Sequence, residues 1–182
     1  MSTRREQILT KAAELFAQRG FHGVSVVELG AACGISGPAL YKHFPSKDAM
    51  LAEMLVDISE ELLRVGRARS RTATDAGDAL HRLVGWHVDF ALHNKPLIVV
   101  QDRDWANLPD EAREKVRSLQ RRYVELWADR LREVHDDLSP RRARAMAHAA
   151  FGLINSTPHS AVLPEDEMAA MLERMALAAL GL

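Results

Sequence analysis

The chain has 182 residues, 47% of them hydrophobic, which suits one sizeable core or a small module joined to a larger helical body. No apolar run approaches the roughly 18 residues of a membrane span, and the N-terminus enters helical periodicity without an apolar signal region. We therefore expect a cytoplasmic protein without membrane contact. The single cysteine, Cys33, excludes an intrachain disulfide and a thiolate metal cluster within one chain.

The net charge of −1 conceals an uneven distribution along the chain. Residues 1–47 hold six basic and three acidic side chains, a balance of +3, whereas the remainder carries −4. Such an asymmetry is expected when only an N-terminal module meets a polyanion.

Apolar residues recur at helical spacing in nearly every segment, and the alternation of half-buried strands is absent. The sequence therefore predicts an all-α fold of about nine helices. The first helix is expected over about residues 3–19, and Gly20 supplies its C-terminal stop. Its buried stripe comprises Ile8, Ala12, Leu15 and Phe16.

The next two helices are short. Ser25 and Glu28 form a capping box that begins a helix over residues 26–33, and Ser36 caps a third helix over 37–43. A fourth helix begins at Lys47 and reaches about residue 69. Pro, Gly, Asn and acidic turn residues then delimit further helices near 74–93, 96–107, 109–136, 139–157 and 164–180.

Four residues, 33–36, join the second and third helices, and this is the connection that a helix-turn-helix requires over about residues 26–45. Gly34 can adopt the positive φ of the turn, and Ile35 can fill the angle between the helices. The third helix would then enter a DNA major groove.

Three stretches carry a resemblance to a known family: residues 21–26 (FHGVSV), 31–36 (AACGIS) and 40–50 (LYKHFPSKDAM). Together they resemble the DNA-binding domain of the TetR (tetracycline-repressor-like) family over about the first 60 residues. The resemblance implies a DNA-binding domain at 1–47 and a helical effector-binding and dimerisation domain at 48–182. It implies a transcriptional regulator, by family default a repressor, that binds a near-palindromic operator as a homodimer and is released by a small-molecule effector.

Carried over by position, the resemblance assigns particular residues to the DNA. The base-facing residues are Gly37, Pro38, Ala39 and Lys42, and the phosphate-facing residues are Ser36, Tyr41, His43 and Lys47. We also expect the basic residues Arg4 and Arg5 at the DNA. Because Pro38 and Ala39 have no hydrogen-bonding side chain, sequence readout should depend on Lys42, on apolar contact and on DNA shape.

Two positions depart from many relatives, which carry Arg at Val27 and Ala at Gly30. The first change removes a potential contact with DNA. The second should cost about 1 kcal/mol of helix stability, unless another backbone packs closely there.

By the same resemblance, the middle helices build an effector cavity. Its candidate residues are Trp86, His87, Phe90, Trp105, Tyr123, Trp127, His148, Phe151 and Asn155, each of which could instead be core. A lipophilic small molecule is the expected effector, and an acyl-coenzyme A thioester is a narrower alternative. The arginines at 64, 67, 69 and 71 either complement the C-terminal end of the fourth helix or, with Arg121 and Arg122, attract an anionic effector.

The last two helices are rich in alanine and methionine. By resemblance they form a four-helix bundle between two subunits, and the alternative is core within one chain. Cys33 is either a packing residue or a redox sensor, and its place among small residues favours packing.

We expect no metal, cofactor or catalytic site. His81, His87 and His93 lie six residues apart, so they point in different directions on a helix, unlike the i, i+4 pair of a helical zinc site. The alternatives to a regulator are a helical enzyme or a protein-binding adaptor without DNA binding.

Overall fold

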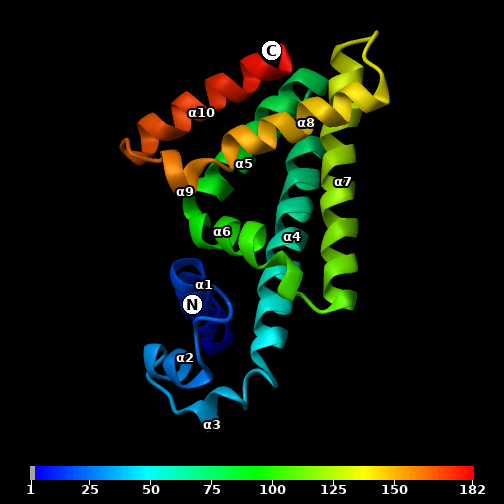
Figure 1. The fold of residues 1–182 in the computed structure, drawn as a ribbon. Helices are drawn as coiled ribbons and strands as arrows, with labels where there is room; N and C mark the ends of the chain where they lie inside the picture. The colour runs from blue at the N-terminus through cyan, green and yellow to red at the C-terminus, as the bar shows by residue number, and fades with distance from the viewer. Residues whose placement is uncertain (1–2) are drawn as a thin grey trace. The chain divides into compact units, whose positions relative to one another are not determined.

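The computed structural model describes residues 3–182, and throughout this range every regular element is a helix, which confirms the all-α prediction (Figure 1). Met1 and Ser2, which belong to the N-terminus where we expect no apolar signal region, lie outside the described residues. No helix in the described part of the chain is long and apolar enough to cross a membrane. The chain forms two compact units: the residues up to Ile58 together with Pro96–Val116, and Ser59–Lys95 together with Arg117–Leu182.

The N-terminal unit begins with three helices whose starts follow local capping chemistry. They are α1 (Arg4–Arg19), α2 (Val26–Ala32) and α3 (Gly37–Leu40). The predicted capping box of α2 is present, because the Ser25 hydroxyl accepts a hydrogen bond from the Glu28 N–H while the Glu28 carboxylate accepts one from the Ser25 N–H. Hydrogen bonds from Ser25 and from Arg19 hold the pKa of Glu28 down to about 2.

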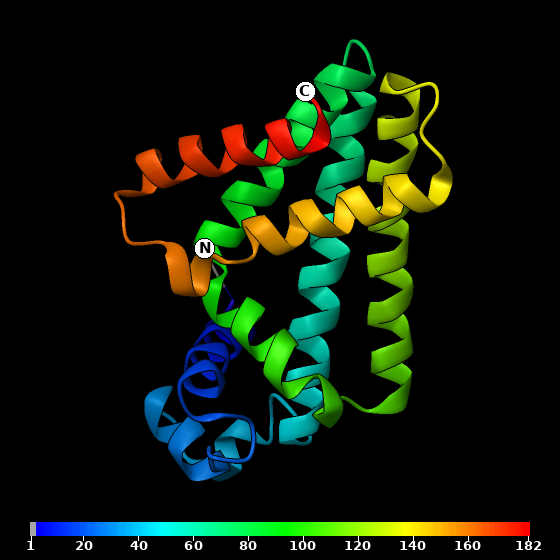
Figure 2. The same ribbon diagram turned by 45° about the horizontal axis from the view of Figure 1, so that its top comes forward.

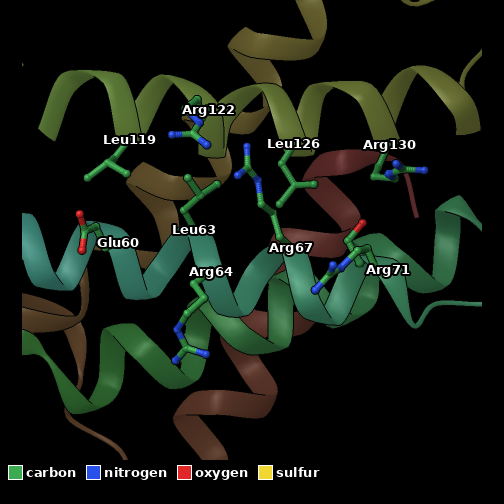
Figure 3. Close-up of a pocket in the computed structure, with 10 residues that line it drawn as sticks. Glu60, Leu63, Arg64, Arg67, Arg71, Leu119, Arg122, Leu126 and Arg130 are labelled. Atoms are coloured by element: carbon green, nitrogen blue, oxygen red, sulfur yellow. The ribbon is translucent and has the colours of Figure 1, made fainter. Parts of the chain in front are cut away.

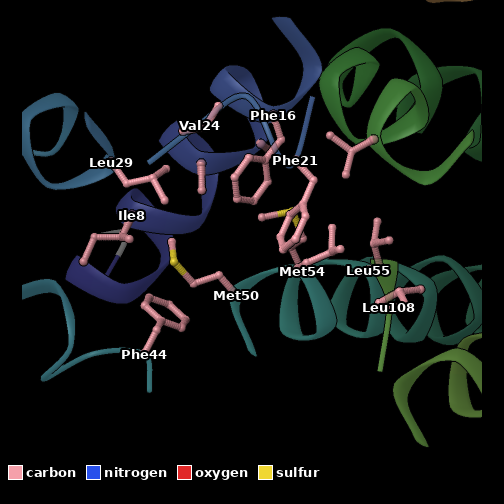
Figure 4. Packing of buried hydrophobic residues seen from close by; sticks show 14 of the residues in the cluster. Ile8, Phe16, Phe21, Val24, Leu29, Phe44, Met50, Met54, Leu55 and Leu108 are labelled. Atoms are coloured by element: carbon pink, nitrogen blue, oxygen red, sulfur yellow. The ribbon is translucent and has the colours of Figure 1, made fainter. Parts of the chain in front are cut away.

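The core of this unit comes from α1, the loop after it and the first half of α4 (Lys47–Arg71) (Figure 4). Ile8, Ala12 and Phe16 are buried as the spacing predicted, and Leu15 packs at the edge. Met50, Leu51, Met54 and Leu55 supply the facing side of the cluster from α4. Leu29 of α2 and Leu40 of α3 belong to the same cluster, so this core also holds the two short helices.

A later segment completes the N-terminal unit: α6 (Lys95–Asp104), the 3₁₀ turn η1 (Trp105–Asn107) and the start of α7 (Asp110–Val134). Arg103 donates hydrogen bonds to the Phe16 and Ala17 carbonyls at the C-terminal end of α1. The buried Asp104 carboxylate accepts one from the Phe21 N–H at 3.3 Å. The end of α6 therefore binds two carbonyls in the last turn of α1 and one N–H in the loop that follows it.

The C-terminal unit contains the second halves of α4 and α7, which lie side by side (Figures 1 and 2). It also contains α5 (Ala76–His93), α8 (Pro140–Ile154), the single turn α9 (Thr157–Ser160) and α10 (Glu165–Leu180). α10 packs against α5 and α8. Ala143, Ala147 and Ala150 are buried on the inner face of α8, whereas Ala145 and Ala149 are exposed on the outer face. The small residues of α8 therefore serve the core of one chain and also leave a second face open.

Gly30 lies where two backbone segments of the helix-turn-helix meet. A β-carbon at this position would lie 2.8 Å from the Ile35 carbonyl oxygen and 3.2 Å from the Gly37 nitrogen. Another backbone does pack closely here, so alanine could fit only if the turn moved away. The departure from alanine at this position therefore has a steric reason.

We predict that Gly30→Ala lowers the free energy of unfolding by about 1 to 3 kcal/mol, because the clash with a backbone oxygen outweighs the gain in helix propensity. The matched control is Gly37→Ala, where a β-carbon meets nothing within 4 Å and should leave stability unchanged or raise it. Urea unfolding of the two variants measures the difference. Equal stability of both would show that the turn tolerates a side chain at residue 30.

Candidate nucleic-acid interface and effector site

The turn between α2 and α3 has the geometry that its residues predicted. Gly34 adopts a φ of 66°, a conformation that favours glycine, and the Ile35 N–H donates to the Gly30 carbonyl at 2.9 Å. Ile35 packs half-buried against the core cluster. The Ser36 hydroxyl accepts a hydrogen bond from the Ala39 N–H at 3.3 Å and so caps α3. This serine therefore fixes the start of the third helix.

The third helix is shorter than predicted. It ends at Leu40, and residues 41–43 continue as a turn in which the His43 N–H donates to the Leu40 carbonyl. The Lys42 N–H likewise donates to the Ala39 carbonyl, so the backbone here follows the tighter i→i−3 pattern, and Pro45 then excludes helical geometry at Phe44.

The outer face of α3 and this turn presents most of the residues assigned to DNA. Pro38, Tyr41 and Lys42 are exposed, Tyr41 by 53%, and Gly37 and Ala39 are half-buried beside them. Lys42 forms no ion pair with any residue in the range 3–182. A phenol and an unpaired ammonium group thus extend from one short segment. Both can donate to phosphate oxygens or base edges.

Lys47 lies differently from Lys42. Its Nζ donates to the carbonyl oxygens of Phe21 and Val24, at 2.7 and 2.8 Å, and lies 4.4 Å from the centre of the Phe21 ring. The ammonium group therefore ties the start of α4 to the loop after α1. Its three donor positions are largely used within the unit.

Arg4 and Arg5 are also held by contacts within the fold. Arg4 donates to the Cys33 carbonyl, and Arg5 donates to the His43 carbonyl and to the Glu53 carboxylate. The Arg5 guanidinium also lies 4.0 Å above the Phe44 ring. Both arginines thus bind backbone carbonyls of the helix-turn-helix, while their guanidinium groups remain partly exposed, and the His43 side chain is half-buried.

Two neighbouring residues complete the picture of this surface. Val27 on α2 is 73% exposed, so the position where the family resemblance leads us to expect arginine is an apolar surface group in this chain. Cys33 is half-buried against the core cluster, and burial raises the pKa of its thiol. Its environment suits packing better than thiolate chemistry.

The C-terminal unit gathers a polar and aromatic cluster around His87, which is 2% exposed. The His87 ring stacks on Phe151 with centroids 4.7 Å apart, and its Nε2 lies 3.1 Å from the Asn155 Oδ1. Its Nδ1 lies 3.4 Å from the Tyr123 hydroxyl. A neutral ring that donates from Nε2 and accepts at Nδ1 satisfies both partners. Phe90 and Trp127 meet the His87 ring edge-on.

Burial sets the ionisation of this cluster. It lowers the pKa of His87 to about 4, and the hydrogen bond with Asn155 offsets only part of that effect. Burial likewise raises the pKa of Tyr123. At neutral pH the cluster therefore carries no charge, and its polar atoms act as hydrogen-bonding groups in an apolar setting.

Two features of the cluster escaped the sequence analysis. The indole N–H of Trp127 is buried beside the Tyr123 hydroxyl but makes no hydrogen bond of regular geometry among the described residues. Gly66 on α4 makes room for Tyr123, because a β-carbon there would lie 2.7 Å from the tyrosine ring. The glycine inside an otherwise helical stretch was the only available signal for this close approach.

Not all predicted effector residues join this cluster. Trp86 lies at its edge, 6.2 Å from Phe90 between ring centroids, and donates its indole N–H to the Leu62 carbonyl. His148 touches Phe151 edge-on but is exposed. Trp105 belongs to the N-terminal unit, where it packs against that unit's core.

The histidines do not assemble with other ligand types. Within residues 3–182, no three His, Cys, Asp or Glu side chains are grouped so that they could hold a metal ion. His93 lies on the surface near Asp89 and Glu165, far along α5 from His81.

Comparison with known proteins finds relatives in sequence. The chain is 35% identical to the "HTH-type transcriptional activator FasR" of Mycolicibacterium smegmatis over half of this chain and 42% of that protein. It is 28% identical to the "HTH-type transcriptional repressor KstR2" of the same species over 72% of this chain and 65% of that one. The chain thus matches less than two thirds of the length of these curated relatives.

Solved structures match over nearly the whole chain. A TetR-family transcriptional regulator from Bordetella parapertussis is 25% identical, with a TM-score of 0.87 over 99% of this chain and 95% of that one. AibR in complex with isovaleryl coenzyme A and operator DNA is 19% identical, with a TM-score of 0.78 over 95% of this chain and 97% of that one. Because AibR is only 19% identical, its similarity to this chain shows a shared fold and no more.

Two family models match consecutive parts of the sequence. The model "Bacterial regulatory proteins, tetR family" matches residues 8–54, and the model "Tetracyclin repressor-like, C-terminal domain" matches residues 73–159. The chain therefore belongs to the TetR family of bacterial regulatory proteins.

Proposed function

We propose that the chain is a DNA-binding transcriptional regulator that recognises a near-palindromic operator as a homodimer and responds to a small-molecule effector. Residues 1–47 bind the DNA, and residues 48–182 bind the effector and form the dimer. The observation that carries this proposal is the exposed, unpaired Lys42 beside Tyr41 at the end of a helix-turn-helix. A protein-binding adaptor or a helical enzyme would have no need of this combination.

On DNA, Lys42 is the main hydrogen-bonding group that α3 and its turn offer to base edges, and Tyr41 binds a phosphate. Pro38, Ala39 and the exposed Val27 offer apolar contact, for example with a thymine methyl group. Lys47, Arg4 and Arg5 contribute to the positive field while they hold the fold together. Repression is the direction of regulation that we assign, as in KstR2, whereas FasR is an activator.

The effector binds at the His87 cluster. His87, Asn155, Tyr123 and Trp127 offer neutral hydrogen-bonding groups within aromatic walls, which suits a mostly apolar molecule with one or two polar atoms. The unpaired indole N–H of Trp127 is a donor that a ligand oxygen can satisfy. The isovaleryl coenzyme A held by AibR has this character in its acyl part.

The dimer forms through the outer faces of α8 and α10. Ala145, Ala149 and Gly152 on α8 and Met175 and Ala179 on α10 are exposed in the single chain. A β-carbon at Gly152 would meet nothing within 4 Å. Small residues with open space above them allow a second pair of helices to approach closely. We expect such a regulator in the cytoplasm, where it can reach the DNA.

We predict that Lys42→Ala weakens binding to a duplex from the DNA upstream of its own gene by roughly 5- to 150-fold, which corresponds to about 1 to 3 kcal/mol for one base contact. Tyr41→Phe should cost less, about 0.5 to 1.5 kcal/mol, as the loss of one hydrogen bond. Fluorescence anisotropy over a salt series measures both. Lys115→Ala, which removes an exposed cation from α7, serves as the control and should bind like the wild type.

The outcome of this titration separates the proposed regulator from its alternatives. Affinity that falls steeply with salt and drops further in the Lys42 variant supports DNA binding. Unchanged affinity in both variants would refute the assignment of this surface.

We predict that the stability of the protein falls as the pH is lowered from 6.5 to about 4. His87 stays neutral in the folded state down to about pH 4, whereas the unfolded chain takes up its proton near 6.5. Proton uptake by the unfolded state over this window removes about 3 kcal/mol of folding free energy. Urea unfolding at a series of pH values measures the slope.

His87→Gln should flatten this slope, since glutamine does not titrate. The control is His81→Gln, which replaces an exposed histidine on the same helix and should keep the wild-type slope. Equal slopes in the two variants would contradict a buried neutral His87.

A further inference from the structure

An arginine-rich groove lies in the C-terminal unit between α4 and α7, and its volume is about 520 Å³ (Figure 3). Five arginines line it: Arg64, Arg67 and Arg71 from α4, and Arg122 and Arg130 from α7. Glu60 is the one acidic residue that lines the groove within the described chain. In Figure 3 the side chains of Arg67 and Arg122 extend from the two helices into the space between them. The sequence had left open whether such arginines attract an anion.

The positive charge of this groove is only partly neutralised by the protein. Arg64 lies 3.7 Å from Glu61 and Arg130 lies 2.7 Å from Glu133. Arg67, Arg71 and Arg122 form no ion pair within residues 3–182. Neighbouring guanidinium groups repel one another, and a bound anion relieves that repulsion.

A buried donor points to the same conclusion. The Nε of Arg130 is buried and has no hydrogen-bond acceptor in the described part of the chain. A buried guanidinium N–H without a partner is costly, and an anionic oxygen in the groove would satisfy it.

The helix dipole does not explain this arrangement. Arg71 in the last turn of α4 does complement the C-terminal end of that helix. Arg122 and Arg130, however, come from the interior of α7. Arg69, which belongs to the same series in the sequence, instead lies 5.3 Å above the Trp86 ring, outside the groove. The arginines that line the groove therefore come from two helices, and the dipole of α4 accounts for only one of them.

The walls of the groove also contain apolar surface. Leu63 and Leu119 are buried, and Leu126 is half-buried beside them. Guanidinium groups match phosphate oxygens in geometry and charge, and they stack on flat rings. A ligand for this groove should thus combine several phosphate oxygens with a flat or apolar part. The volume lies within the range of sites that hold such molecules.

We propose that the α4–α7 groove binds the diphosphate of a nucleotide-type ligand, either as a free nucleotide or as the nucleotide portion of a coenzyme A thioester. The proposal that the groove binds such a ligand depends only on the residues that line it. The further idea that this ligand is an effector rests on the proposed function.

Isothermal titration of the full chain with ADP, with coenzyme A and with inorganic phosphate tests the proposal. ADP and coenzyme A should bind with an affinity that falls as salt is added, and inorganic phosphate should bind far more weakly. Arg67→Gln and Arg122→Gln should each weaken binding by about tenfold or more. Arg67→Lys should restore only part of the loss, because lysine keeps the charge without the bidentate geometry.

The matched control is Arg132→Gln, which removes an exposed arginine of α7 that does not line the groove and should leave binding unchanged. Circular dichroism checks that each variant is folded. If one of the variants is not folded, Arg71→Gln is measured in its place. Tighter binding of coenzyme A than of ADP assigns the ligand to the thioester source, and equal binding assigns it to free nucleotides. Failure of both ligands to bind at millimolar concentration, or equal losses in the Arg132 variant, would overturn the proposal.

Operator binding without ligand is measured separately, so the two proposals can fail independently. A chain that binds operator DNA but neither ADP nor coenzyme A refutes the groove and leaves the regulator intact. A chain that binds these ligands through Arg67 and Arg122 but ignores DNA supports the groove and refutes the regulator.

Discussion

The close backbone approach at Gly30 fixes the surface on which the proposed DNA recognition depends. The Ile35 N–H donates to the Gly30 carbonyl, and the Ile35 oxygen and Gly37 nitrogen occupy the space that a side chain would take. The turn is thereby held tightly on α2, and Ser36 can begin α3 directly after it. The exposed positions of Tyr41 and Lys42 follow from this geometry, because the segment that carries them is anchored only four to five residues earlier.

The helices and the turn of the N-terminal unit could be read from the sequence because their signals are local. Ser25 with Glu28, Ser36 and Gly34 act on residues within a few positions of themselves. The roles of the basic residues could not be read in this way. Lys42 and Lys47 look alike in the sequence, yet the carbonyls that receive the Lys47 ammonium belong to a loop more than twenty residues earlier. Only the tertiary fold distinguishes a free cation from a structural one.

The same limit applies to the aromatic residues. Helical spacing places Trp105 and Trp127 on apolar faces, and nothing nearby tells which core each face meets. The decisive feature for Trp105 is the anchoring of α6 on the end of α1 through Arg103 and Asp104, which are long-range contacts. The His87 cluster, in contrast, was partly predictable, because His87 and Phe90 come from one helix and Phe151 and Asn155 from another at helical spacing.

α4 contributes buried side chains to both compact units, which bears on how an effector could act. Leu51 and Leu55 belong to the N-terminal core, while Leu63 is buried and Gly66 packs on Tyr123 in the C-terminal unit. A ligand can change operator affinity only through a difference in its own affinity for two states of the protein. A coupling of about 1 to 3 kcal/mol would be enough for regulation. Because Gly66 meets Tyr123 of the His87 cluster and Arg67 lines the groove, adjacent residues of one continuous helix meet both proposed ligand sites, so either ligand can bias the same helix.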